Sequence, residues 1–453
     1  MGDAARRPTV LMFPFLAHGH ITPYLGLAKN LSDRGFLIYL CSTPILLVSI
    51  KKMIPEIYSG SILPVELHLP HLPDLPPHYH TTNGLPPHLH PTLRKALRMS
   101  KPNFSNILHT LKPDLLIFDF LQIWAEVMAR DLHIPAIRFY NACAATSSYI
   151  NFMTRNASSA SQTESYPYPA LRLKGGGEAI FRAAVDNVIK TGREPEECLS
   201  EPQMVLMSTS MEMEPEYIEY YSRTIGCKVV PVGILAQEPQ AEESPENTEE
   251  ILDWLRKKDE GSVLYISFGS EYFLTKEEMN EMAHGLELLM DPTEISFIWV
   301  LRFPKGEKSS AQDSLPHGFV KRIGERGRIV EGWAPQVRIL AHPSVGGFVT
   351  HCGWNSIMES LNFAVPIIAL PMHVDQPVNA RFLVEKGLAV EIERGGDGKL
   401  RREEMAKAVD EAIGGENGEA LKMRVKNMSF RLKMKQREEM DGAAQELTKL
   451  CGM

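Results

Sequence analysis

Short apolar runs alternate with amphipathic stretches along almost the whole chain, and this alternation constrains the fold more than any other feature. In the first half, the runs that predict strands are Val10–Phe15, Leu37–Cys41, Leu115–Phe118, Ala136–Phe139 and Val205–Ser208. Helical patterns such as Tyr24–Ser32 and Ile123–Leu132 lie between them. Strands that alternate with helices in this way predict parallel sheets covered by helices.

The same pattern begins again in the second half of the chain. Its strand candidates are Ser262–Gly269, Ser296–Leu301, Gly346–Thr350 and Val365–Leu370. Between the halves, residues 236–247 are acidic, rich in proline and poor in apolar residues, which is typical of a solvated linker. A chain of 453 residues is also longer than a domain with a single hydrophobic core usually is. We therefore expect two doubly wound α/β domains that face each other across a cleft, with one substrate at the carboxyl edge of each sheet.

The composition is that of a globular protein, with 44% apolar and 23% charged residues. A formal net charge of −8 argues against non-specific affinity for nucleic acid or anionic membranes. No run of about 18 apolar residues predicts a transmembrane helix, and the first apolar run, at Val10, lacks the small-residue cleavage site of a signal peptide.

The six cysteines show neither paired nor Cys-x-x-Cys spacing: Cys41, Cys143, Cys198, Cys227, Cys352 and Cys451. Scattered cysteines of this kind indicate free thiols in a reducing compartment. We therefore expect a cytoplasmic protein that has no nucleic-acid partner and does not insert into a membrane.

Residues 64–91 are rich in proline and carry six histidines: His68, His71, His78, His80, His88 and His90. Their spacing matches no zinc pattern and no cysteine joins them. A surface loop near a ligand cleft is the favoured interpretation, and metal binding stays open as the minor alternative.

One predicted strand-to-helix turn has the features of an anion site. The strand Phe348–Thr350 is followed by His351-Cys-Gly-Trp-Asn355-Ser356, and Ile357–Asn362 predicts a helix. A glycine-containing turn presents backbone amides and the positive end of the helix dipole, which favour a diphosphate. His351 and Asn355 add hydrogen-bond donors there.

The same residues also allow a purely structural interpretation. Ser356 and Glu359 have the spacing of a capping box, in which both side chains serve only the first turn of their own helix. Trp333 and Trp354 are also compatible with ordinary core aromatics. The spacing alone favours the capping box.

From Trp333 to Gln376 the sequence resembles the signature box of plant family 1 UDP-dependent glycosyltransferases. The resemblance rests on Trp333-Ala-Pro-Gln336, His351-Cys-Gly-Trp-Asn-Ser-Ile-Met-Glu359 and Asp375-Gln376. It continues at the N-terminus, at Ser267-Phe-Gly-Ser270 and across most of the chain. The resemblance implies a GT-B fold, in agreement with the two predicted domains.

The resemblance also implies a role for each matching residue. Trp333 stacks on uracil, and the backbone of Ala334 with the side chain of Gln336 fixes the base and the ribose. Glu359 accepts hydrogen bonds from the ribose hydroxyls. A second group holds the diphosphate: Ser270, His351, Asn355 and Ser356. A third group lines the donor sugar: Trp354, Asp375 and Gln376.

The turn after the first strand carries the candidate catalytic base. Phe15–Pro23 follows the strand, and Thr22 and Pro23 suit the N-cap and the first position of a helix. A histidine beside a helix N-terminus is biased toward its neutral form and can accept a proton. The residues alone leave a catalytic and a structural histidine equally open. The resemblance identifies the base as His20, with His18 as the weaker candidate.

The family orients its base with an aspartate just past a later strand, and here Asp119 matches. The resemblance makes Asp119 the residue that fixes the tautomer of the base and stabilises the imidazolium. Asp114 precedes that strand and lies at the wrong edge of the sheet. The chain has no Asp-x-Asp pair for a divalent cation, so we expect a metal-independent reaction. A single displacement at an α-linked UDP-sugar would give a β-glycoside.

The resemblance also bears on specificity. Gln376 usually accompanies UDP-glucose in this family, while other UDP-sugars stay open. Met12–Pro23, Phe36–Pro44 and Ser267–Phe273 are similar to the branch that extends sugar chains on terpenoid or flavonoid glycosides. We therefore expect an already glycosylated acceptor, with an aglycone hydroxyl as the alternative. Asn141 lies where the family often places a further contact to the donor sugar.

Together these observations predict an acceptor-binding domain at 1–235, a linker at 236–250 and a UDP-sugar-binding domain at 251–433. A helix at 434–453 is expected to pack back on the first domain. We expect the protein to be a monomer. No cofactor beyond the UDP-sugar co-substrate is expected. A dinucleotide-dependent oxidoreductase would need GxGxxG after a strand, which neither turn provides. A non-catalytic nucleotide-sugar-binding protein is the remaining alternative, and His20 and Asp119 argue against it.

Overall fold

The computed structural model describes residues 6–157, 165–173, 178, 181–183, 186, 204–236, 248–270, 272–290, 295–303 and 310–452. The chain divides into two compact units. The first comprises Met1–Thr163, Arg182–Gln237 and Leu432–Met453, and the second comprises Glu164–Phe181 and Glu238–Arg431. Of the predicted linker, residues 237–247 lie outside the described residues.

The described part of the first unit contains a seven-stranded parallel sheet with the order β3-β2-β1-β4-β5-β6-β7. Its strands are β1 (Thr9–Phe13), β2 (Leu37–Ser42), β3 (Ile62–Glu66), β4 (Leu115–Asp119), β5 (Ala136–Tyr140), β6 (Met204–Met207) and β7 (Lys228–Pro231). The order 3-2-1-4-5-6 is that of a doubly wound sheet, in which ligands bind where the strand order reverses. In this sheet the reversal lies between β1 and β4.

The described part of the second unit repeats this topology in a six-stranded parallel sheet with the order β10-β9-β8-β11-β12-β13. Its strands are β8 (Val263–Ser267), β9 (Ser296–Leu301), β10 (Gly327–Glu331), β11 (Val345–Thr350), β12 (Ile367–Ala369) and β13 (Ala389–Glu391). The strand order reverses between β8 and β11. The prediction of two doubly wound α/β domains is confirmed.

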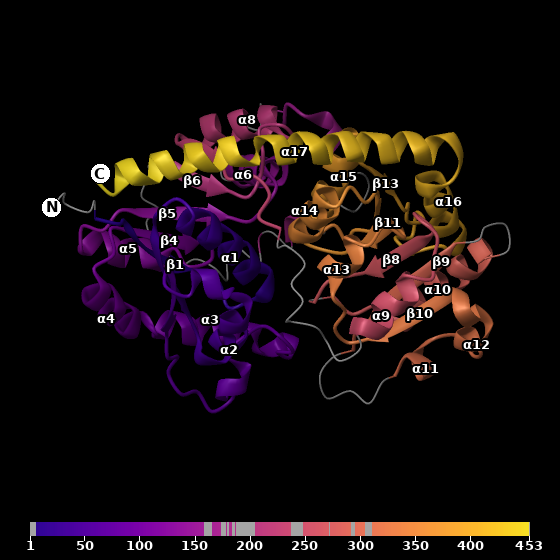
Figure 1. Ribbon diagram of the computed structural model, residues 1–453, viewed down its shortest axis with the longest axis horizontal. Helices are drawn as coiled ribbons and strands as arrows, with labels where there is room; N and C mark the ends of the chain where they lie inside the picture. The colour runs from indigo at the N-terminus through magenta and orange to yellow at the C-terminus, as the bar shows by residue number, and fades with distance from the viewer. Residues whose placement is uncertain are drawn as a thin grey trace. The chain divides into compact units, whose positions relative to one another are not determined.

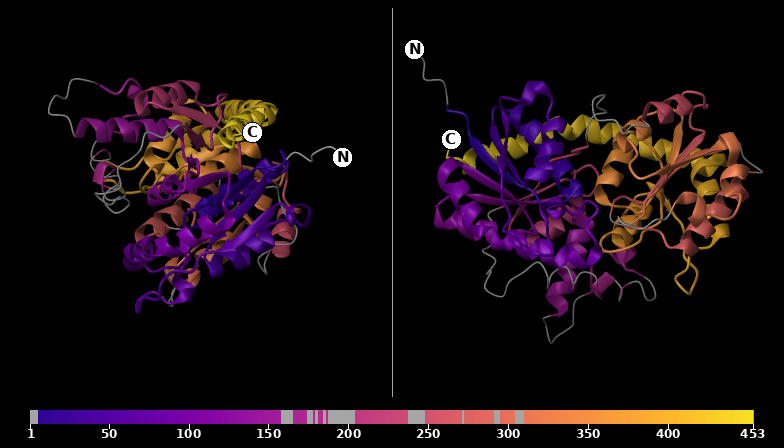
Figure 2. Two further views of the ribbon diagram at one scale, coloured as in Figure 1. Left: turned by 90° about the vertical axis from the view of Figure 1, so that its left-hand side faces the viewer. Right: turned by 90° about the horizontal axis from the view of Figure 1, so that it is seen from below.

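Helices lie on both faces of each sheet (Figures 1 and 2). Those in the first unit are α1 (His18–Ser32), α2 (Pro44–Met53), α3 (His90–Met99), α4 (Lys101–Leu111), α5 (Trp124–Asp131), α6 (Ala144–Ala157) and α8 (Pro215–Ile225). Those in the second are α9 (Thr248–Leu255), α10 (Lys276–Met290), α11 (Ala311–Ser314), α12 (Phe319–Ile323), α13 (Gln336–Leu340), α14 (Trp354–Asn362), α15 (Gln376–Glu385) and α16 (Arg402–Ile413). Short 3₁₀ turns lie at Glu56–Tyr58, Pro77–Tyr79, Pro87–Leu89, Pro169–Leu171 and Gly324–Arg326. Because both faces are covered, the central strands β4 and β8 are buried throughout.

The last helix, α17 (Gly415–Leu450), ends among residues of the first unit. Its apolar residues Met440, Ala443 and Leu447 belong to the same hydrophobic core as β1 and β4. The side chain of Gln436 accepts a hydrogen bond from the backbone nitrogen of Ile234 at 2.6 Å. Apolar burial and polar contacts thus hold the end of the chain to the first unit.

The helix α14 ends in a left-handed residue that is not glycine. The nitrogen of Ala364 donates to the carbonyl of Leu361, and the nitrogen of Val365 donates to that of Ser360, which is the Schellman pattern. Ala364 therefore occupies the position where glycine is preferred, and its φ is 57°. Because a Cβ makes the left-handed region unfavourable, alanine is strained at this position.

We expect Ala364→Gly to raise the free energy of unfolding by about 0.5–1 kcal/mol, because it relieves the left-handed strain at a small cost in chain entropy. Urea unfolding of the two proteins measures the change. Ala406→Gly, inside α16, is the matched control and should lower stability by about 1 kcal/mol. Equal destabilisation by both substitutions would contradict this account of the turn.

Candidate active site

The carboxyl ends of β1 and β4 bring together two of the predicted residues. The strands are neighbours, with Phe13 paired to Phe118, so the turn after β1 lies beside the end of β4. His20 is the third residue of α1, and Asp119 is the last residue of β4. The Nδ1 of His20 lies 2.6 Å from Oδ2 of Asp119.

Asp119 is almost fully buried, and its second oxygen accepts a hydrogen bond from the backbone nitrogen of Leu121 at 3.0 Å. A buried carboxylate at Nδ1 selects the imidazole tautomer with its proton on that nitrogen, so the lone pair lies on Nε2. Phe15 and Phe120 pack against the His20 ring, with centroid distances of 5.5 and 6.0 Å. The arrangement fixes both the orientation and the tautomer of the His20 imidazole.

The two weaker candidates have different surroundings. Burial lowers the pKa of His18, whereas the 2.6 Å contact to the carboxylate belongs to His20. Asp114 precedes β4, and its Oδ2 accepts hydrogen bonds from the backbone and the hydroxyl of Thr9, both at 2.8 Å. Asp114 therefore joins two strands at the opposite edge of the sheet.

The predicted start of the first helix is wrong. The helix begins at His18 with Ala17 as its N-cap, and Pro23 lies inside it. Because proline has no N–H, Pro23 cannot donate to the carbonyl of Gly19 four residues earlier. The side chain of Asn141 donates to that carbonyl instead, at 3.3 Å. Asn141 thus has a structural partner in the first turn of α1, next to the candidate base.

In the second unit, His351 lies where the strand order reverses. β8 and β11 are neighbours, with Ser267 paired to Thr350, so Gly269 and Gly353 approach the imidazole closely. An added Cβ would lie 2.8 Å from His351 Nε2 at Gly269 and 2.5 Å from it at Gly353. Burial, with His373 and Arg302 nearby, lowers the pKa of His351 to about 3. His351 is therefore neutral at pH 7, so its ring can take part in hydrogen bonds but carries no charge.

Three predicted residues meet through their side chains beside this turn. The Nε2 of Gln336 donates to Oε2 of Glu359 at 2.7 Å and to the hydroxyl of Ser356 at 3.1 Å. Burial raises the pKa of Glu359 to about 7, and the hydrogen bond from Gln336 opposes this rise. The capping-box alternative is wrong, because α14 begins at Trp354 with Gly353 as its N-cap. Ser356 and Glu359 therefore lie inside the helix.

Trp333 is 51% exposed, which is unusual for such a large aromatic side chain. The guanidinium of Arg302 lies 4.7 Å from its ring centroid and also donates to the carbonyl of Gly332 at 3.1 Å. An exposed indole held in place by a cation provides a surface on which a planar base can stack. Arg302 was not among the predicted residues, although it directly follows the predicted strand Ser296–Leu301 at its carboxyl end. Ala334 is buried next to Trp333.

The predicted donor-sugar residues lie at the start of α14 and α15. Trp354 is buried as the first residue of α14, and Asn355 follows it. Asp375 is the N-cap of α15, and its Oδ2 accepts a hydrogen bond from Asn379 at 2.8 Å. Ser270 is exposed in the loop after β8.

Gln376 makes structural hydrogen bonds that the sequence did not predict. Its Oε1 accepts hydrogen bonds from the backbone nitrogens of Met372 and His373, each at 3.0 Å, and so closes the loop Met372–Gln376. Within that loop Val374 has a φ of 53°. A β-branched residue in the left-handed region stores about 1–3 kcal/mol of strain, which the surrounding contacts must offset.

Four of the six histidines in residues 64–91 are exposed, as expected of a surface loop: His68, His71, His78 and His88. Across the described residues, no group of three or more His, Cys, Asp or Glu side chains has the arrangement of a metal site. Within the same part of the chain, no helix is long and apolar enough to cross a membrane.

Comparisons with known proteins agree with this geometry. The family model described as "UDP-glucoronosyl and UDP-glucosyl transferase" matches residues 101–433. The chain is 46% identical over 444 residues to the β-D-glucosyl crocetin β-1,6-glucosyltransferase of Gardenia jasminoides, covering 97% of this chain and 98% of that protein. It is also 46% identical over 441 residues to a mogroside IIIx synthase of Siraitia grosvenorii, covering 96% and 95%.

Solved structures show the same fold. A UDP-glycosyltransferase of Glycyrrhiza uralensis, complexed with glycyrrhetinic acid 3-O-monoglucuronide, matches with a TM-score of 0.82 at 25% identity, covering 98% of this chain and 96% of that one. A UDP-glycosyltransferase of Phytolacca americana, complexed with UDP-2-fluoro-glucose and pterostilbene, matches with a TM-score of 0.78 at 26% identity, covering 98% and 100%. The chain is therefore an enzyme with the GT-B fold and belongs to the plant family 1 UDP-dependent glycosyltransferases.

Proposed function

We propose that this enzyme transfers glucose from UDP-glucose to a hydroxyl of a small-molecule glycoside, terpenoid or flavonoid, and so extends its sugar chain through a β-linkage. The observation that carries the catalytic part is the 2.6 Å contact between His20 and Asp119 at the carboxyl edge of the first sheet. The acceptor class is supported by the relative from Gardenia jasminoides, a glucosyltransferase that acts on a glucosyl crocetin.

In the proposed reaction, Nε2 of His20 takes the proton of the acceptor hydroxyl as its oxygen forms a bond to the anomeric carbon. The bond from that carbon to the diphosphate breaks at the same time, and the configuration inverts. The buried carboxylate of Asp119 stabilises the imidazolium that forms. Residues 1–235 with 434–453 form the acceptor-binding part of the protein.

Residues 251–433 form the donor-binding part. Uracil stacks on Trp333 beside the backbone of Ala334. Glu359 accepts hydrogen bonds from the ribose hydroxyls, and Gln336 contacts the base and the ribose. His351, Asn355, Ser356 and Ser270 bind the diphosphate, where the N-terminal end of α14 stabilises its charge. Trp354, Asp375 and the amide of Gln376 contact the glucose. These groups make a metal ion unnecessary, and the enzyme acts as a cytoplasmic monomer.

The donor part can be tested at the glycine beside His351. Gly353 has an ordinary φ of −63°, so alanine there is opposed by contact with the imidazole rather than by the backbone. We expect Gly353→Ala to weaken UDP binding by about tenfold, equivalent to about 1.4 kcal/mol. Isothermal titration with UDP measures the effect. Gly396→Ala is the control, because a Cβ at Gly396 meets no atom within 4 Å, and unchanged binding in Gly353→Ala would contradict the assignment.

The function is tested by incubating the protein with UDP-glucose and a panel of flavonoid and triterpenoid aglycones beside their monoglucosides, with product masses as the readout. We expect one hexose to be added to the glucosides. Transfer mainly to aglycones would overturn the proposed acceptor class and leave the enzyme class intact. Nucleotide-sugar binding with no transfer to any acceptor would favour a non-catalytic binding protein.

A further inference from the structure

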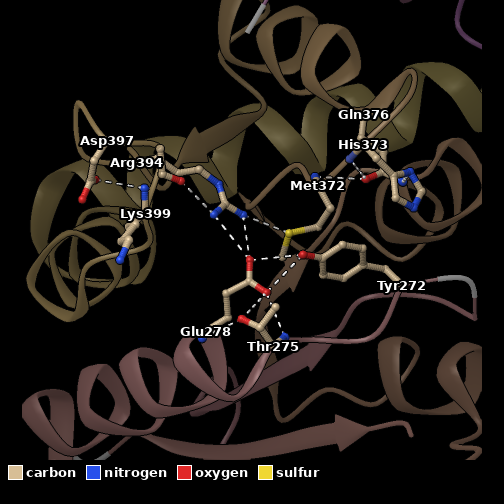
Figure 3. A network of polar contacts seen from close by, with 10 residues as sticks. Tyr272, Thr275, Glu278, Met372, His373, Gln376, Arg394, Asp397 and Lys399 are labelled. Atoms are coloured by element: carbon tan, nitrogen blue, oxygen red, sulfur yellow. Dashed lines mark hydrogen bonds and ion pairs between the residues drawn. The ribbon is translucent and has the colours of Figure 1, made fainter. Parts of the chain in front are cut away.

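A polar network lies beside the loop Met372–Gln376 (Figure 3). Its centre is Glu278 in the first turn of α10, whose side chain is only 13% exposed. The carboxylate accepts hydrogen bonds from the hydroxyl of Tyr272 at 3.1 and 3.2 Å, and from the backbone and hydroxyl of Thr275 at 3.0 and 3.1 Å. It also pairs with the guanidinium of Arg394 at 3.4 Å.

Two members of this network touch the loop itself. Arg394, which follows β13, donates to the sulfur of Met372 at 3.0 Å. The ring of Tyr272 packs edge-on against that of His373, with 5.6 Å between centroids. Because Glu278 holds both Arg394 and Tyr272, a single carboxylate fixes both of the network's side chains that contact the loop.

The contacted residues are those that set the shape of the loop. The backbone nitrogens of Met372 and His373 are the two donors to Oε1 of Gln376. The next residue, Val374, has the strained φ of 53°, and Asp375 follows it. A strained turn persists only where surrounding contacts determine it. The loop is therefore held by Gln376 from within and by the network through two side chains.

We propose that Arg394, held in place by Glu278, is a positioning residue for the donor sugar. It keeps the loop Met372–Gln376 in the strained turn that presents Asp375 and Gln376 to the sugar. This inference rests on the proposed donor site. Arg394 acts through the loop and does not contact the substrate itself.

A second ion pair provides a matched comparison within the same unit. Arg402, at the start of α16, donates to both carboxylate oxygens of Glu281, one helical turn further along α10 than Glu278. Each arginine therefore forms an ion pair with a glutamate of α10, Arg394 from the segment after β13 and Arg402 from the start of α16. Of these two ion pairs, the pair of Arg394 and Glu278 is the one that contacts the loop, through the sulfur of Met372.

The experiment measures binding of UDP and of UDP-glucose separately, by isothermal titration, for the wild type, Arg394→Met and Arg402→Met. We expect Arg394→Met to weaken UDP-glucose binding by about tenfold, equivalent to about 1.4 kcal/mol, and to change UDP binding less than about twofold. The KM for UDP-glucose should rise in parallel. Arg402→Met should leave the ratio of the two affinities unchanged.

A second variant separates loop geometry from general loss of stability. Glycine adopts a positive φ without the penalty of a β-branched side chain, so Val374→Gly should restore most of the UDP-glucose affinity in the Arg394→Met background. Equal loss of UDP and UDP-glucose binding, the same loss in Arg402→Met, or no recovery with Val374→Gly would each overturn the inference. A wild type that binds neither ligand would overturn the proposed function as well.

Discussion

Replacing His20 with alanine is expected to lower kcat for glycosyl transfer by about a hundredfold or more, because a positioned general base contributes at least that factor. The affinity for UDP should stay unchanged, because the proposed nucleotide residues lie in the other compact unit. Steady-state kinetics with a saturating acceptor, together with titration of UDP, separate the two effects.

Asp119→Asn tests the same pair without removing the imidazole. Asparagine places a neutral amide where the carboxylate lies 2.6 Å from Nδ1, so no charge stabilises the imidazolium. The amide can also donate to Nδ1, which would favour the tautomer with the proton on Nε2. We expect a loss in kcat of at least about tenfold, again with unchanged UDP affinity. His18→Ala is the control in the same turn and should retain most of the activity. Full transfer by His20→Ala would refute the assignment of the base.

The second large effect is expected at Glu359. Ribose hydroxyls donate to a carboxylate more strongly than to a neutral group, and hydrogen bonds to a charged partner contribute about 1.5–3 kcal/mol. The affinity for UDP-glucose should therefore rise as the pH increases through about 7, the pKa to which burial raises Glu359. Glu359→Gln should weaken binding by about tenfold or more at pH 8 and much less at pH 6.

UDP-glucose is the suitable ligand for this test, because its phosphodiester groups do not titrate in this range. Titration calorimetry at several pH values provides the measurement. Glu411→Gln, on an exposed surface of the same unit, is the control and should keep the wild-type pH profile. An identical pH profile for wild type and Glu359→Gln would contradict the role of this carboxylate.

The same shift affects the stability of the ligand-free enzyme. The pKa of Glu359 is about 7 in the folded state, against 4.5 as its ordinary value, so the folded state holds the proton more tightly. This tighter proton binding adds about 3 kcal/mol to the free energy of unfolding below pH 4.5. The added stability is lost as the pH rises through 7. The free energy of unfolding, measured with urea, should differ less between pH 5 and pH 8 for Glu359→Gln than for the wild type.

The four strands that the sequence did not predict are the edge strands β3, β7, β10 and β13. An edge strand is buried less completely than a central one, so it lacks a continuous apolar run. Pro64 lies inside β3, and Arg328 and Glu331 are exposed in β10. By contrast, β9 was predicted to the residue, because it is buried along its whole length.

The site shows a similar division. Single-sequence motifs and the family resemblance named His20, Asp119, Gln336 and Glu359, and the structure brings these together in two pairs. Contacts between distant segments that belong to no motif of the family were not predictable, because no local pattern encodes them. Examples are the donation of Asn141 to the carbonyl of Gly19 and the pairing of Arg394 with Glu278.

Inverting transfer of glucose to a glycoside by His20 and Asp119 can be followed directly in a proton NMR time course. The enzyme, UDP-glucose and a glucoside accepted in the mass-based panel are followed through their anomeric signals. We expect the α-anomeric signal of UDP-glucose to decay while a new β-anomeric signal of the product grows at the same rate. A product with an α-anomeric signal, or decay of UDP-glucose to free glucose alone, would contradict this expectation.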